Sequence, residues 1–202
     1  MLRIKSLKKY IINKGQQRGR IPYIHILVNK NNMLSGGFIP DNLIGEGKTM
    51  LCAVCANAFD RMCQNARKSG IVINSVSGYR SFQRQRQVYI ESCLTNGIEH
   101  AIRYVAPPGA SEHQTGLAID VSCDDIDNEL TDEFGATKAG QWLEKYSHYY
   151  GFILRYPKGW EDITGFGYEP WHFRYVGNEL AIHMKKNNIY TLEQWYCCYG
   201  RK

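Results

Sequence analysis

Residues 111–120 read Ser-Glu-His-Gln-Thr-Gly-Leu-Ala-Ile-Asp, a run that joins a turn to a short strand. Alternation over 117–122 places the apolar side chains on one face of that strand and Asp120 on the other. Gly116 lets the chain turn just before the strand, so His113 and Asp120 can face the same side although they are seven residues apart. This stretch therefore predicts a small sheet that carries two metal-binding side chains.

A second run, Glu169-Pro-Trp-His172, supplies a further imidazole and a further carboxylate. Pro170 disfavours helix at Glu169, so we expect a turn or bulge there, leading into a strand that carries His172. Two histidines and one aspartate leave a tetrahedral zinc with one open position, as in catalytic zinc sites. Glu169 is then available as a base. Each residue alone has an ordinary structural explanation, but the combination predicts a zinc hydrolase with one ion per chain.

The remaining pattern predicts an α+β domain, because short strands and helices alternate without a regular βαβ repeat. The central element would be a small, mainly antiparallel sheet flanked by helices. We expect strands at 23–28, 71–77, 117–122, 152–156 and 171–176. We expect helices at 47–69, from Ser81 to about 94, at 136–149, and at 180–196 with a break near Asn187.

The basic excess of the chain lies at its start. The formal net charge is +6, but residues 1–20 hold seven basic residues and no acidic ones, leaving 18 basic and 19 acidic residues beyond them. We therefore divide the chain into a basic arm, residues 1–22, and one domain, residues 23–202. The near-neutral domain argues against a nucleic-acid partner. The sequence contains neither a signal peptide nor an apolar run long enough to span a bilayer, so a cytoplasmic location is expected.

The sequence resembles the zinc D,D-peptidases of the VanY and VanXY type. The motifs that carry the resemblance are Ser111-x-His113-x-x-Gly116-x-Ala118-x-Asp120, Glu169-Pro-Trp171-His172, Ser77-Gly-Tyr79-Arg80-Ser81 and Gly151-Phe-Ile-Leu-Arg-Tyr-Pro157. The resemblance implies a Hedgehog/D,D-peptidase-like fold. It also implies hydrolysis of D-Ala-D-Ala, or of peptidoglycan stem peptides that end in it, and with that a link to vancomycin resistance.

The resemblance also implies roles for single residues. His113, Asp120 and His172 would bind the zinc, and Glu169 would take a proton from the attacking water and pass it to the leaving amine. Arg80 would polarise the scissile carbonyl, although an arginine there is also compatible with a surface ion pair. Ser111 and Gln85 would bind the substrate, and loops 97–109 and 124–135 would roof the cleft.

Two other functions remain open at this level. One is a related peptidase that cuts an L,D or L-Ala-D-Glu bond of peptidoglycan. The other is a zinc-stabilised binding domain without catalysis, against which an intact Glu169 and Arg80 argue. The sequence leaves the choice between dipeptide and pentapeptide substrates undecided, because that choice depends on the shape of the loops around the cleft.

Overall fold

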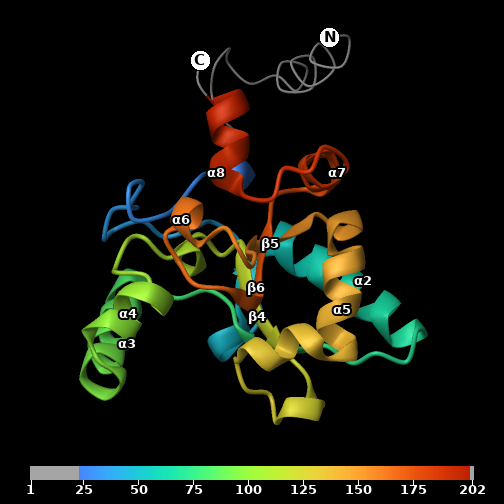
Figure 1. Cartoon of the computed structure of the whole chain (residues 1–202), viewed down its shortest axis with the longest axis horizontal. Coiled ribbons are helices and arrows are strands. Elements are labelled where there is room, and N and C mark those ends of the chain that lie inside the picture. Colours follow the sequence, from blue (N-terminus) through green and yellow to red (C-terminus); the bar gives the residue numbers. More distant parts are fainter. Residues whose placement is uncertain (1–22, 201–202) are drawn as a thin grey trace.

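The computed structural model describes residues 23–200, and a four-stranded antiparallel sheet lies at its centre (Figure 1). The strand order is β3-β4-β6-β5. The strands are β3 (Asn74–Ser77), β4 (Ala118–Ser122), β5 (Phe152–Tyr156) and β6 (Glu169–Tyr175). A separate two-stranded ladder pairs β1 (Leu43–Ile44) with β2 (Leu51–Cys52). The predicted α+β class with a small antiparallel sheet is confirmed.

One face of the sheet packs on α2 (Ala53–Lys68) and α5 (Lys138–Tyr146), which lie together on one side of it in Figure 1. The α2 sequence repeats apolar residues at helical spacing, and this stripe is buried against the sheet. The rings of Phe59 and Phe152, for example, meet edge to face with centroids 6.4 Å apart. Ile119 and Val121 of β4 belong to the same core, as their alternation predicts. Burying this face leaves the opposite face of the sheet for chemistry.

The opposite side of the sheet carries a helical pair, α3 (Phe82–Asn96) and α4 (Ile98–Tyr104) (Figure 1). Ser81 caps α3 by accepting a hydrogen bond from the Arg84 backbone N–H, as predicted. Gly97 then ends α3 with φ +87°. The remaining helices are the short α6 (Glu161–Thr164), α7 (Asn178–Lys186) and α8 (Leu192–Trp195), and the last two enclose a second apolar cluster. The predicted break near Asn187 separates α7 from α8.

The strand predicted at 23–28 is wrong. Tyr23–His25 forms a turn of 3₁₀ helix instead. The backbone of this segment bonds to side chains and not to a neighbouring strand. Arg174 donates to the carbonyls of Ile24 and Ile26, and the Leu27 N–H donates to the Tyr196 hydroxyl. Apolar alternation alone could not reveal those distant partners.

The helix predicted at 47–69 begins only at Ala53. The preceding backbone is used elsewhere: Gly78 N–H donates to the Lys48 carbonyl at 2.7 Å, and Tyr79 N–H donates to the Met50 carbonyl at 2.6 Å. The helix predicted at 136–149 likewise covers Lys138–Tyr146 and continues as a 3₁₀ turn over Ser147–Tyr150. Strand 71–77 is shortened to β3, because its first residues lie outside the ladder.

The basic arm, residues 1–22, lies outside the described residues, so neither its structure nor the predicted domain boundary is tested. Within residues 23–200, no helix is both long and apolar enough to cross a bilayer.

Candidate metal centre

Asp120 lies in the middle of β4 on the face turned away from the core. It is paired with Ser77 of β3 on one side and with His172 of β6 on the other. Its carboxylate is almost completely buried, with 4% of the residue exposed. The central strand thus holds one acidic group at a fixed position between two neighbouring strands.

His113 reaches Asp120 from a 3₁₀ turn, Glu112–Thr115, that precedes the strand. Gly116 ends this turn in the left-handed region with φ +66°, and a Cβ atom there would lie 2.9 Å from the Cys52 sulfur. The turn predicted at this glycine is therefore present, and space around it is tight. It brings Nε2 of His113 within 3.1 Å of an Asp120 carboxylate oxygen.

Glu169 and His172 lie three residues apart in one strand, β6, so strict alternation would place them on opposite faces of the sheet. The pairing with β5 is irregular here: β5 advances from Leu154 to Tyr156 while β6 runs from Phe173 to Glu169. This irregularity agrees with the predicted bulge, and it lets both side chains face the same cavity. A carboxylate oxygen of Glu169 lies 3.9 Å from Nδ1 of His172.

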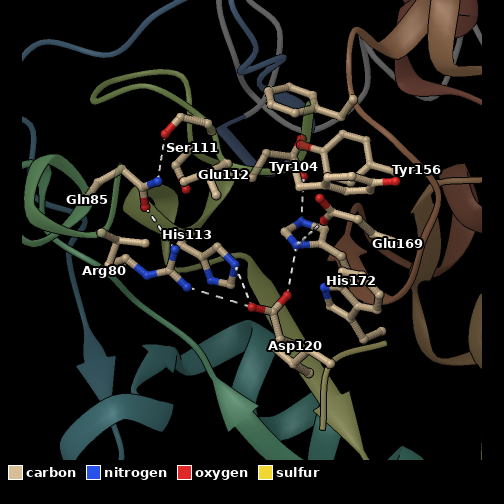
Figure 2. A pocket seen from close by; sticks show the side chains of 16 residues that line it. Arg80, Gln85, Tyr104, Ser111, Glu112, His113, Asp120, Tyr156, Glu169 and His172 are labelled. Atoms are coloured by element: carbon tan, nitrogen blue, oxygen red, sulfur yellow. Dashed lines mark hydrogen bonds and ion pairs between the residues drawn. The ribbon is translucent and has the colours of Figure 1, made fainter. Parts of the chain in front are cut away.

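His113, Asp120 and His172 form a buried cluster whose ligand atoms all lie within 4.8 Å of one another (Figure 2). Nδ1 of His172 is 2.9 Å from the second Asp120 oxygen. Nδ1 of His113 is 2.6 Å from the Gly78 carbonyl, which directs Nε2 of that ring to the cluster. Two imidazoles and one carboxylate with a shared open side fit a catalytic zinc ion. The structure thus brings together the three side chains that the two sequence motifs single out.

The pKa values of this metal-free cluster are displaced in opposite directions. Burial raises the pKa of Glu169 to about 8. Burial alone would lower the pKa of His172, but the nearby Asp120 and Glu112 carboxylates raise it to about 9. Despite burial, the two histidines hold the pKa of Asp120 well below its usual range. Asp120 is therefore an anion, and Glu169 is a carboxyl group that exchanges its proton near neutral pH.

Arg80 stands at the edge of the cluster, directly before α3. Its Nη2 atom donates to Ser77 Oγ at 2.8 Å and lies 3.7 Å from Asp120. Nη1 donates to Gln85 Oε1 at 2.9 Å, and the Gln85 amide donates in turn to the Ala106 carbonyl. The structure thus brings Arg80 to the site, whereas both ends of the Gln85 amide are already bonded to protein groups. The surface ion pair considered for Arg80 is not what the structure shows.

These groups line a cavity of about 180 Å³, the one drawn in Figure 2. Ser111 also lines it, and so do Tyr104, Val105 and Ala106 from the first predicted roof loop and Leu130 from the second. Much of the first loop is in fact α4. The walls that the sequence analysis did not identify are mostly apolar or aromatic: Val88, Tyr156, Phe166 and Trp171.

The sequence profile of the VanY family, described as D-alanyl-D-alanine carboxypeptidase, matches residues 48–178 and so includes every residue of this cluster. The chain belongs to the VanY family. Its similarity to the putative carboxypeptidase YodJ of Bacillus subtilis (strain 168) is 40% identity over 180 residues, 84% of this chain. The aligned region spans 66% of the length of YodJ.

Solved structures of LdcB and VanY, among others, share the fold of this VanY-family chain. The LD-carboxypeptidase LdcB superposes with a TM-score of 0.79 at 40% identity, covering 86% of this chain and 85% of LdcB. The D,D-pentapeptidase VanY from a VanB-type resistance cassette, a mutant in complex with Zn(II), gives a TM-score of 0.74 at 30% identity. The match covers 86% of this chain and 99% of the VanY chain. The fold is therefore that of the VanY and LdcB peptidases.

Proposed function

We propose that this chain is a zinc-dependent carboxypeptidase that hydrolyses the C-terminal D-Ala-D-Ala bond of peptidoglycan precursors. The observation that carries the proposal is one cavity that gathers His113, Asp120 and His172 with a spare carboxyl group and an arginine. The family profile and the Zn(II)-bound VanY structure support it. Cleavage of this bond would also remove the target of vancomycin-type antibiotics.

Within this site, a zinc ion on the three ligands would supply Lewis acidity and lower the pKa of a coordinated water to roughly 7. Glu169 faces the same space, so its carboxylate accepts a proton from the attacking water and then donates it to the leaving D-alanine amine. Arg80 provides a fixed pair of donors for the oxyanion that develops on the scissile carbonyl.

The substitution Glu169→Ala tests this assignment. It removes the proton acceptor but none of the three ligands, so zinc should remain bound while D-alanine release falls by at least about 10²-fold. Glu179→Ala, the same change at an exposed position of α7, serves as the control. The measurement is D-alanine release from a pentapeptide stem, together with zinc content. Full activity in Glu169→Ala would overturn the assignment.

A second candidate function is release of D-alanine from an L,D bond. The specific observation behind it is the similarity to LdcB, which at 40% identity exceeds the 30% to the VanY structure. The two candidates differ in the residue before the scissile bond, which has the D configuration in one and the L configuration in the other. The experiment therefore offers three substrates in parallel: D-Ala-D-Ala, a pentapeptide stem ending in D-Ala-D-Ala, and a tetrapeptide stem ending in an L,D bond.

The outcomes separate the candidates cleanly. Release from the pentapeptide supports the D,D-carboxypeptidase, and additional release from the dipeptide supports a dual VanXY-type enzyme. Release from the tetrapeptide alone supports the L,D-carboxypeptidase. If the zinc-loaded protein cleaves none of the three, another peptidoglycan bond or the non-catalytic zinc domain becomes the better proposal.

A further inference from the structure

The ring of His172 has one nitrogen that faces away from the metal cluster. Nδ1 faces Asp120 and Glu169, whereas Nε2 lies 3.5 Å from Oε2 of Glu112. Both of these atoms are buried, and within residues 23–200 neither has a hydrogen-bond partner that satisfies normal geometry. Buried polar atoms generally need a hydrogen-bond partner, and here each of these two atoms is the nearest candidate for the other: Nε2 as the donor and Oε2 as the acceptor.

The other oxygen of Glu112 is occupied by two fully buried arginines. Oε1 accepts from Arg155 Nε at 2.8 Å and from Arg174 Nη1 at 2.7 Å. Arg155 is fixed in turn by Glu193, to which it donates two hydrogen bonds of 2.9 and 2.7 Å. Because guanidinium groups only donate, the two arginines hold Oε1 and leave Oε2 directed at His172.

We propose that Glu112 is a positioning residue for the zinc site. It accepts the Nε2 proton of His172 in a hydrogen bond and so keeps the lone pair of Nδ1 free for the metal ion. The Gly78 carbonyl does the same for the other histidine, with the nitrogens exchanged: it lies 2.6 Å from Nδ1 of His113 and leaves Nε2 for the metal. The inference rests on the zinc site of the proposed function, and it explains why an acidic side chain is completely buried behind that site.

Glu112 has an alternative, purely structural role as counter-ion of the two arginines. The substitution Glu112→Gln distinguishes the two roles. The amide oxygen must face the arginine donors, so the NH₂ group faces Nε2 of His172 and can only donate. The imidazole then accepts at Nε2 and carries its proton on Nδ1, the atom that the metal ion requires.

Glu193→Gln is the matched control. It also converts a carboxylate bonded to Arg155 into an amide, but Glu193 has no recorded contact with His172. Zinc dissociation constants are measured for the wild type and both variants by competition with a chromophoric chelator, and melting temperatures report on folding. We expect Glu112→Gln to weaken zinc binding by about 10- to 100-fold, and Glu193→Gln to leave it within about threefold of the wild type.

Equal zinc affinity in Glu112→Gln and the wild type, or equal losses in both variants, would overturn the inference. A wild type that binds no zinc would instead overturn the zinc site itself, so the two failures are distinguishable. If Glu112→Gln does not fold, nitrogen NMR of the zinc-loaded wild type decides the question. The expected result is Nδ1 of His172 on the metal and a protected proton on Nε2; metal on Nε2 contradicts the inference.

Discussion

At the scale of single residues, two neighbouring side chains hold Arg80 in place, which suits the oxyanion-binding role proposed for it. Its two terminal nitrogens donate to Ser77 and Gln85, and the side chain lines the cavity. This arrangement fixes the direction of the charge. A lysine at this position would keep the charge but not the planar pair of donors.

We therefore expect Arg80→Lys to lower kcat by about 10²- to 10³-fold, the usual cost of losing an oxyanion donor. Zinc affinity should stay unchanged, because Arg80 is not one of the three ligands. Steady-state kinetics with the best of the three substrates, together with chelator competition, measures both quantities. Arg84→Lys on the exposed side of α3 is the control. A normal kcat in Arg80→Lys would show that the oxyanion is held by other groups.

The residues of the metal cluster could be predicted from the sequence because their types and spacing carry the chemistry. Glu112 could not, although it adjoins His113. Its hydrogen-bond partners are Arg155 and Arg174, which lie 43 and 62 residues further along the chain. A signal was present in the sequence: Arg155 interrupts the otherwise apolar and aromatic run Phe152–Tyr156, and Arg174 lies between Phe173 and Tyr175. A charged residue in such surroundings is unusual without a buried partner.

At the scale of elements, α3 joins the stability of the fold to the geometry of the cavity. Ser81 caps its first turn, and Gln85, one turn further on, accepts from Arg80. Loss of the cap should therefore affect both. We expect Ser81→Ala to lower the free energy of unfolding by about 1 kcal/mol, measured by urea denaturation. Ser69→Ala, at the end of α2, where no side-chain cap bond is recorded, is the comparison. Equal losses in both variants would contradict the capping role.

Element boundaries were predicted well where the signal is local and poorly where it is not. Phe152–Tyr156 is a strand with the predicted bounds, directly after Gly151, and Ser81 caps the helix that it was expected to cap. The errors at 23–28 and 47–52 share one cause. Both segments give their backbone groups to partners far away in sequence, such as Arg174 and Gly78, and no local pattern records those bonds.

At the scale of the whole molecule, the site makes the stability of the metal-free protein depend on pH. The pKa of His172 is raised to about 9 in the folded protein. Its contribution to the free energy of unfolding is therefore complete below pH 6.5 and is lost as the pH rises through 9. Glu169 has its pKa raised to about 8, so the folded state is also disfavoured as the pH rises from about 4.5 to 8. Both groups therefore make the metal-free protein less stable between pH 6.5 and 8.

Zinc binding at the proposed site would have the opposite dependence, because it would require an unprotonated Nδ1 on His172. We expect the difference in melting temperature between the protein with one equivalent of zinc and the metal-free protein to widen from pH 6.5 to 8.5. Thermal unfolding across this range measures it. In Glu169→Gln, the melting temperature of the metal-free protein should fall less over the same pH range. A difference that does not change with pH would contradict the assignment of these groups.

The cytoplasmic location and the division at residue 22 stay predictions, and cell fractionation and limited proteolysis would test them.

The buried network behind His172 also bears on how this catalytic unit can be moved between proteins. The family profile ends at residue 178, yet Glu193 and the Ile24 and Ile26 carbonyls that hold Arg155 and Arg174 lie beyond its limits. A graft of residues 48–178 into another scaffold would carry every proposed zinc ligand and Glu112. It would leave the two buried arginines without Glu193 and without the Ile24 and Ile26 carbonyls. The unit that must be kept intact is thus longer than the region matched by the family profile, and fusions or truncated versions should keep at least residues 23–196.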